Sequence, residues 1–304
     1  MTKKKQTIYV YPKFDSFLDI GIRIGGFGLA NCLFVYSRAL VLANQNGYQF
    51  INPTWQRFGI GQYLRREKDK RHYFNIFKKE GIAGIRKYLI LYFSKWYCEN
   101  VIPTSNSHVR IVISIEGVDS YFSPLLPYQK LIKQKLYSIS RFSINGENYK
   151  YSIGIHIRLG DFVSEYRTPV DWYIEKINQI KEITNNLASF VLFSDGSDEE
   201  LKNVLKIENV KRNFSQNAFL DILGLSECAL ILGSDSTFSG WAVFLGQKPA
   251  VFLKKHYGNV LLDKNYEIIL KQNEELPSNV KQYLSSHFNL KFKNDGQNSS
   301  ASNN

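Results

Sequence analysis

The chain has 304 residues with 44% hydrophobic content, so two globular domains are expected rather than one compact core or a disordered protein. Its net charge of +12 indicates an anionic partner: a phosphate group, a nucleic acid or an acidic membrane surface. Three scattered cysteines suggest neither a disulfide framework nor a cysteine-rich metal site. The absence of a signal peptide or of a run of about 20 apolar residues predicts a cytoplasmic protein.

The first half of the chain predicts one α/β unit. A strand over 20–24 runs into a glycine-rich turn at 25–28, and apolar residues at three-to-four spacing then predict a helix over 29–46. Gly47 provides a stop for this helix, because glycine readily takes the left-handed conformation at a helix end. The unit is completed by strands over 49–51 and 109–115 and a helix over 127–138.

The second half alternates strand and helix after a polar linker at 145–148. A helix is predicted to start at Thr168 as its cap, with Pro169 in the first turn. Further helices are predicted over 198–206, 217–227 and 238–245, and strands over 151–157, 189–193, 229–232 and 249–252. This alternation calls for a parallel sheet covered by helices on both faces.

We therefore predict the α/β fold class, with two Rossmann-like domains that face a cleft. The domains span 1–147 and 148–292, and residues 293–304 form a disordered tail. In sheets of this kind, ligands bind beyond the carboxyl ends of the strands. Each of the four motifs in this sequence falls at such a strand end.

The first motif is the glycine turn Gly25-Gly26-Phe27-Gly28, which leads into Asn31 on the following helix. Glycines allow the backbone to approach a ligand closely, and the first N–H groups of a helix attract an anion. An ordinary strand-to-helix turn explains this motif equally well when it is taken alone.

The second motif, His156-Ile157-Arg158-Leu159-Gly160-Asp161, follows the strand over 151–157. Strand alternation points His156 and Arg158 to the same side, and the planar fork of an arginine suits phosphate oxygens. The alternative is an internal ion pair between Arg158 and Asp161, with His156 satisfied in the core.

Two further motifs are rich in small polar residues. Asp195 ends Phe193-Ser194-Asp195 and is expected to accept hydrogen bonds from a base or ribose, or to cap the next helix. The segment from Gly233 to Trp241 offers hydroxyls and helix-start amides as an anion cradle, although hydroxyl-rich caps also occur without a ligand. Its candidate ligand-binding residues are Ser236, Thr237, Phe238 and Ser239.

In this order along the chain, the four motifs resemble the bacterial alpha-1,2-fucosyltransferase family and, more distantly, other GDP-fucose enzymes. The resemblance runs from Gly25 to Phe252 with gaps. This chain departs from the family pattern in three places: Leu159 replaces a second arginine, Ala30 replaces a glycine, and Gly240 replaces a tryptophan. Arg158, the arginine that related enzymes use on the diphosphate, is kept.

The resemblance implies a GT-B type glycosyltransferase that moves fucose from GDP-fucose to a hydroxyl, galactose O2, of a surface glycan such as a lipid-linked O-antigen repeat. The first domain would be the acceptor side, and the second would bind the nucleotide sugar. The residues implied in donor binding are Gly26, Gly28, Asn31, His156, Arg158, Asp195, Ser236, Thr237, Phe238 and Ser239.

The implied reaction inverts the anomeric carbon and requires no cofactor and no metal, since the chain has no Asp-x-Asp triplet. Arg158 is the principal predicted catalytic residue because it would hold the diphosphate. Asp161 and Glu165 are the nearest acids, Asp161 as a brace for the loop and Glu165 as a weak candidate base. The general base stays unassigned.

A basic and aromatic stretch from Arg65 to Trp96 forms an insertion in the first domain. It predicts either peripheral contact with an anionic inner membrane or a solvated pair of cationic helices. Its cations are Arg65, Arg66, Lys70, Arg71, Lys78, Lys79, Arg86 and Lys87.

Two rival functions remain open at the level of sequence. One is a transferase of the same fold with another nucleotide-sugar donor, such as a different deoxyhexose or a heptose. The other is a basic nucleic-acid-binding protein, which the net charge of +12 prompts. No RNA-binding aromatic signature or zinc-ligand spacing accompanies that charge, so we expect no nucleic-acid partner.

Overall fold

A computed structural model describes residues 7–16, 18–19, 21–59, 72–99, 101, 110–160, 165, 167–215 and 217–301 of the chain. The chain divides into two compact units. Unit 1 is Met1–Ser143 with Asn217–Phe219, and unit 2 is Ile144–Gln216 with Leu220–Asn304. The main boundary between the units, at 143/144, therefore lies four residues before the predicted boundary at 147/148.

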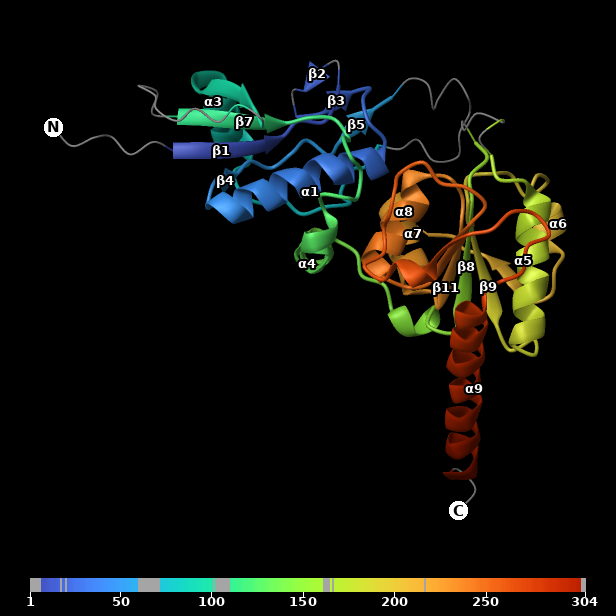
Figure 1. The fold of residues 1–304 in the computed structure, drawn as a ribbon. Coiled ribbons are helices and arrows are strands. Elements are labelled where there is room, and N and C mark those ends of the chain that lie inside the picture. The colour runs from blue at the N-terminus through green and yellow to red at the C-terminus, as the bar shows by residue number, and fades with distance from the viewer. Residues whose placement is uncertain are drawn as a thin grey trace. The chain divides into compact units, whose positions relative to one another are not determined.

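Unit 1 is built on a parallel four-stranded sheet in the order β4-β1-β7-β6 (Figure 1). The strands are β1 (Thr7–Pro12), β4 (Gln49–Phe50), β6 (Lys95–Cys98) and β7 (Arg110–Ile115). A small second sheet, in the order β2-β3-β5, is formed by β2 (Leu18–Asp19), β3 (Arg23–Ile24) and β5 (Arg57–Phe58). The described helices of unit 1 are α1 (Leu29–Asn46), α3 (Gly84–Phe93) and α4 (Gln129–Ile139). A 3₁₀ turn at Leu126–Tyr128 precedes α4.

The predicted helix over 29–46 is confirmed in unit 1. It ends at Gly47 in the left-handed conformation with φ 64°, and the Gly47 amide bonds to the Ala43 carbonyl. The predicted first strand over 20–24 is wrong, because the chain there forms only the short pair β2 and β3 around Gly21. The central strand is β1 instead, whose tyrosines hide its apolar run in the sequence although Tyr9 and Tyr11 are buried.

Unit 2 is a parallel six-stranded sheet in the order β10-β9-β8-β11-β12-β13. The strands are β8 (Ser152–Ile157), β9 (Ser189–Ser194), β10 (Val210–Arg212), β11 (Leu230–Gly233), β12 (Ala250–Phe252) and β13 (Glu267–Ile269). The helices are α5 (Val170–Ile183), α6 (Lys202–Leu205), α7 (Ala218–Glu227), α8 (Thr237–Gly246) and α9 (Ser278–Ala301).

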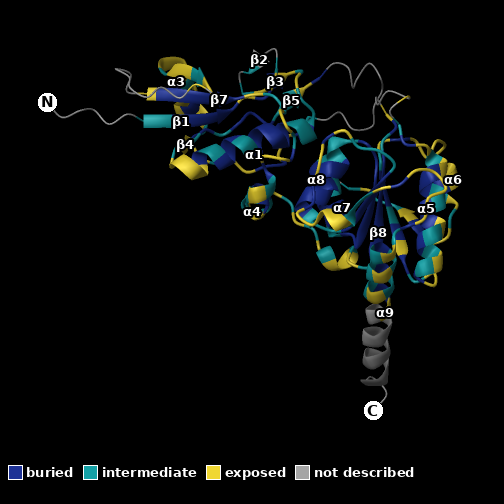
Figure 2. Ribbon diagram, in the orientation of Figure 1, coloured by how far each residue is buried: buried dark blue, intermediate teal, exposed yellow. Residues whose placement is uncertain are grey.

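The core of unit 2 lies on the central strands of its sheet. Ile153, Ile155 and Ile157 of β8 are fully buried, as are Trp172 of α5 and Trp241 of α8 (Figure 2). A strand buried on both faces is typical of a parallel sheet that helices cover. The predicted α/β class with parallel sheets is confirmed, whereas the cleft between the domains stays a prediction.

Several boundaries in unit 2 differ from the predicted ones. α5 begins at Val170 with Pro169 as its cap, so Thr168 is not the cap residue. The helix predicted over 198–206 is reduced to α6, and the short strands β10 and β13 were not predicted. α9 continues to Ala301 where disorder was predicted from residue 293, because helical hydrogen bonds are local and can extend a helix without tertiary contacts. Within the described residues, no helix is both long and apolar enough to cross a bilayer.

Candidate functional site

The order of strands in unit 2 reverses beside β8. The chain moves from β8 outward through β9 to β10, and then returns to place β11 on the other side of β8. In open parallel sheets, ligands bind beyond the carboxyl ends of the strands at such a switch point. The residues that follow β8 and β11 are Arg158 and Ser234, so this crevice contains two of the predicted motifs.

Arg158 forms an ion pair with Asp195, which follows the neighbouring strand β9. Both side chains are about a quarter exposed, at 24% and 25%. Asp195 also accepts a 2.8 Å hydrogen bond from the Leu159 amide, so it fixes the loop after β8 as well as the guanidinium. An internal ion pair was one of the predicted alternatives, and the described ion pair of Arg158 is with Asp195, while the predicted partner Asp161 lies outside the described residues.

Gly160 leaves room for this ion pair. A Cβ atom built on Gly160 would overlap the Asp195 carboxylate, so a larger residue there would displace the partner of Arg158. The predicted loop brace Asp161 lies outside the described residues. The candidate base Glu165 is exposed, and its backbone carbonyl accepts a 3.2 Å bond from Lys254. The described contacts of Glu165 therefore give no support to a role as base.

His156 is a buried link between β8 and α8. Its Nδ1 atom lies 2.6 Å from the Ser239 hydroxyl and 2.9 Å from the Ser234 hydroxyl, and its ring stacks on Phe238 with the centroids 4.7 Å apart. Burial, with a further contribution from the charge of Arg158, lowers the pKa of His156 to about 3. This histidine is neutral at physiological pH and positions the first turn of α8 against the end of β8.

The lowered pKa of His156 makes stability depend on pH. The unfolded chain binds a proton near pH 6.5 that the folded protein accepts only near pH 3, so stability should fall as the pH drops through this window, by up to about 1.4 kcal/mol per pH unit. Urea unfolding of the wild type and His156→Gln between pH 7 and pH 4.5 measures this slope. The glutamine variant should be less stable at pH 7 and lose less stability on acidification. Equal slopes would contradict the assignment of a neutral buried His156.

The N-terminus of α8 faces the same edge of the sheet. Ser236 caps the helix and accepts a hydrogen bond from the Phe238 amide, while Ser236 and Thr237 are only half-buried. The first amides of a helix carry a partial positive charge and attract anions. Arg158 and the first turn of α8 therefore form a positively polarised cradle at the switch point.

An additional pair at this edge was missed in the sequence. Asp235 Oδ1 accepts a 2.9 Å bond from the His256 amide and lies 2.7 Å from His256 Nδ1, which connects the loop after β12 to the start of α8. Asp235 is buried, whereas the side chain of His256 is 47% exposed. The two residues are distant in sequence, so only the order of β11 and β12 in the sheet could have indicated their contact.

The predicted glycine motif belongs to unit 1, and its backbone packs closely against neighbouring backbone. Gly25 and Gly26 have φ of 72° and 77°, and a Cβ atom on Gly26 would overlap the Asp15 carbonyl. Gly28 caps α1, and Asn31 lies in the first turn of that helix. The fully buried Arg23 donates to the carbonyls of Gly25, Phe27 and Thr54 and holds this turn. The candidate residues Gly26, Gly28 and Asn31 are thus in a different unit from Arg158.

A parallel sheet with an arginine and a helix N-terminus at its switch point is typical of proteins that bind nucleotide diphosphates. Residues 129–273, which include β8 to β13 and this cradle, match the model of glycosyl transferase family 11. This match confirms the resemblance that the motifs predicted.

Solved structures are similar at low identity. The fucosyltransferase NodZ from Bradyrhizobium shares 14% identity over 81% of this chain and 95% of that chain, with a TM-score of 0.48. POFUT1 in complex with GDP-fucose shares 11% identity over 84% of this chain and 99% of that chain, with a TM-score of 0.42. The E. coli ADP-heptose LPS heptosyltransferase II shares 14% identity over 94% of this chain and 99% of that chain, with a TM-score of 0.41. No curated protein matches the chain significantly.

Proposed function

We propose that this protein transfers fucose from GDP-fucose to a hydroxyl of a glycan, galactose O2 of a surface glycan such as a lipid-linked O-antigen repeat. The observation that supports this most is the position of Arg158, beside the N-terminus of α8 at the switch point of unit 2. The match of residues 129–273 to the model of glycosyl transferase family 11 and the four ordered motifs favour the same reaction.

The cradle suits the departure of GDP. Negative charge builds on the diphosphate as the glycosidic bond breaks, and groups fixed to receive that charge lower the barrier. Arg158 supplies a planar fork of donors, and the first amides of α8 supply partial positive charge. Asp195 keeps the guanidinium in place before the donor binds, so little reorganisation is needed. We propose that these groups serve in place of a divalent metal.

The reaction that follows is a single displacement with inversion. The acceptor hydroxyl attacks the anomeric carbon from the side opposite the diphosphate, and its proton passes to at most one general base. Glu165 is exposed and Asp161 lies outside the described residues, so the base stays unassigned.

A donor panel tests the proposed function. The purified protein should consume GDP-fucose, by hydrolysis or by transfer to galactosides, at the same rate with and without EDTA. UDP-, ADP- and CMP-linked sugars should be consumed far more slowly. Turnover of an ADP-heptose with none of GDP-fucose would replace the proposed donor, and loss of activity in EDTA would overturn the proposed metal independence.

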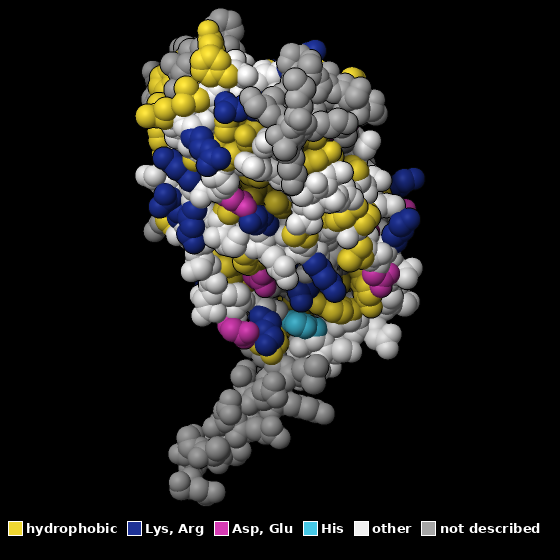
Figure 3. All heavy atoms as spheres, turned by 90° about the vertical axis from the view of Figure 1, so that its left-hand side faces the viewer, with side chains coloured by type: hydrophobic (Ala, Val, Ile, Leu, Met, Phe, Trp, Pro, Cys, Tyr) yellow, Lys and Arg dark blue, Asp and Glu magenta, His cyan; other side chains and the backbone are white. Residues whose placement is uncertain are grey.

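We also propose that unit 1 contacts an anionic membrane through α3 and the segments beside it, in part of the predicted basic stretch. Lys78, Lys79, Arg86 and Lys95 are exposed, and Lys and Arg side chains lie beside hydrophobic ones on the face in Figure 3. Lys87 was predicted among the surface cations but is only 3% exposed, because its ammonium bonds to Thr54. Arg65, Arg66, Lys70 and Arg71 lie outside the described residues. Sedimentation with phosphatidylglycerol vesicles, compared with neutral ones, tests this contact.

A further inference from the structure

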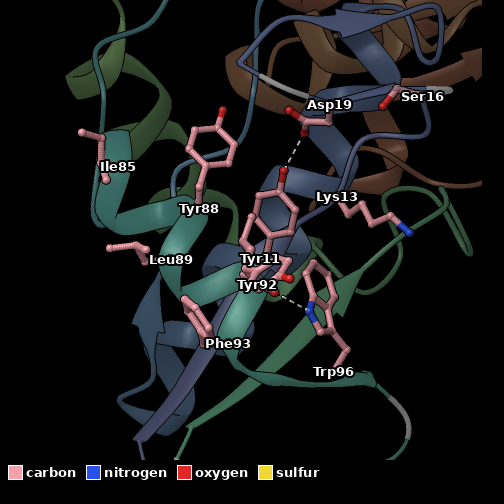
Figure 4. Close-up of a pocket in the computed structure, with 11 residues that line it drawn as sticks. Tyr11, Lys13, Ser16, Asp19, Ile85, Tyr88, Leu89, Tyr92, Phe93 and Trp96 are labelled. Atoms are coloured by element: carbon pink, nitrogen blue, oxygen red, sulfur yellow. Dashed lines mark hydrogen bonds between the residues drawn. The ribbon is translucent and has the colours of Figure 1, made fainter.

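Unit 1 contains a pocket of about 680 Å³ beside α3 (Figure 4). One wall is formed by Tyr88 and Leu89 of α3, and another by Tyr11 of β1 and Trp96 of β6. Asp19 of β2 lies at the pocket with its carboxylate directed toward the Tyr11 hydroxyl. The pocket is thus lined by residues of a single unit, and it lies beside strands that the donor cradle does not use.

A network of buried polar groups supports Asp19. Its Oδ2 atom accepts a 2.7 Å bond from the Tyr11 hydroxyl, and its Oδ1 atom accepts a 2.7 Å bond from the Thr54 hydroxyl. The buried ammonium of Lys87 donates to the same Thr54 hydroxyl at 2.7 Å and lies 4.9 Å from the centre of the Tyr11 ring. Burial lowers the pKa of Lys87 to about 8, although the charge of Asp19 opposes this shift.

Such a network is costly as a purely structural device. Bringing the Lys87 ammonium out of water carries a desolvation penalty that an apolar residue would avoid. Clusters of this kind at the wall of a pocket are therefore candidates for ligand recognition. The carboxylate of Asp19 can also accept hydrogen bonds from a ligand. An ionised carboxylate accepts about four hydrogen bonds, and two protein hydroxyls bond to this one.

Most of the remaining lining is apolar or aromatic, and Lys13 and Ser16 are its further polar residues. Trp96 is 39% exposed, and its ring lies edge-on to Tyr11 with the centroids 6.0 Å apart. Leu89 and Phe93 are 51% and 65% exposed at the rim. A sugar ring has an apolar C–H face that suits an aromatic ring, and hydroxyls around its edge that suit a carboxylate. An apolar group attached to the sugar would suit the exposed rim.

We propose that this pocket binds the acceptor, a glycoside with an apolar aglycone, whose sugar hydroxyl donates to Asp19 and whose ring packs on Tyr11 and Trp96. The aglycone contacts Leu89 and Phe93 of α3. This assignment rests on the proposed transferase function, because it supplies the second substrate of that reaction. It is a statement about binding in unit 1 alone and can be measured without a donor.

Trp96 provides a direct measurement. The other three tryptophans, Trp55, Trp172 and Trp241, are at most 4% exposed, so a ligand in the pocket should change the fluorescence of Trp96 alone. The probe is octyl β-galactoside below its micelle-forming concentration, added in the absence of any nucleotide. A saturable change in emission is expected, and Trp96→Phe should lose it.

Two variants and their control locate the contacts. Asp19→Asn should weaken octyl β-galactoside about tenfold or more, since it replaces a charged acceptor with a neutral one. Leu89→Ala should weaken octyl β-galactoside several-fold and leave methyl β-galactoside unchanged. The control Asp119→Asn alters a carboxylate of the same unit that is 84% exposed, and it should leave the affinities for octyl and methyl β-galactoside unchanged. Circular dichroism and thermal melting establish that each variant is folded.

The outcomes separate this proposal from its alternatives. An equal response to octyl β-glucoside and octyl β-galactoside, with no effect of Asp19→Asn, would show a merely apolar pocket and overturn the proposal. A Trp96 response to phosphatidylglycerol vesicles and to no glycoside would assign the surface to lipid and overturn it as well. If the protein binds galactosides saturably but consumes no GDP-fucose, the proposed glycoside pocket is supported and the proposed donor is wrong.

Discussion

Replacing Arg158 with alanine should lower kcat/KM for fucosyl transfer about 100- to 1,000-fold, the loss seen when one fixed donor to a developing oxyanion is removed. The physical reason is that Arg158 follows β8 at the switch point, where Asp195 orients its guanidinium. With Leu159 in place of a second arginine, the position next to Arg158 supplies no second guanidinium. Steady-state kinetics with GDP-fucose and a galactoside acceptor measure the loss.

Two further variants sharpen the interpretation of this result. Arg158→Lys keeps the charge but not the planar fork, and it should recover only part of the rate. Lys211→Ala, at an exposed cation of β10 in the same unit, should retain full activity. An Arg158→Ala protein within about threefold of wild-type activity would show that another group holds the diphosphate.

Replacing Arg23 with alanine should destabilise unit 1 by about 3 to 5 kcal/mol, because each buried carbonyl left without its donor costs about 1 to 3 kcal/mol. Arg23 is fully buried, and its guanidinium donates to three backbone carbonyls, those of Gly25, Phe27 and Thr54. Without it these carbonyls lose a donor, and the turn that caps α1 loses its anchor. Hydrogen exchange of the α1 amides measures the loss within unit 1.

The matched control is Arg110→Ala, at the exposed first residue of β7 in the same unit. It should change the free energy of unfolding by less than about 0.5 kcal/mol, as surface substitutions usually do. A loss of under 1 kcal/mol in Arg23→Ala would mean that the glycine turn is held by its own backbone conformation.

The sequence predicted the elements whose signals are local. The three-to-four spacing of apolar residues and Gly47 located α1 at both ends, and apolar runs located β7, β8 and β9 within one or two residues. It failed at β1, where tyrosines interrupt the apolar run and where packing rather than composition buries Tyr9 and Tyr11. Short strands such as β13 leave too few residues for a periodic signal.

The candidate site shows the same division. The positions of Arg158 and Ser236 at strand ends followed from the sequence, because parallel strands bring their carboxyl ends to one edge. Two contacts of the site did not follow, because Asp195, the partner of Arg158, and Ser239, the partner of His156, come from other strands and helices. The burial of Lys87 was equally hidden, since Thr54 and Asp19 reach it from distant parts of the chain.

The most direct test of the central claim is a crystal structure of the protein with GDP bound. Oxygens of the diphosphate should lie within about 3.2 Å of the Arg158 guanidinium and face the first turn of α8, with Asp195 still beside the arginine. GDP bound away from the carboxyl ends of β8 and β11, with Arg158 contacting only Asp195, would contradict it.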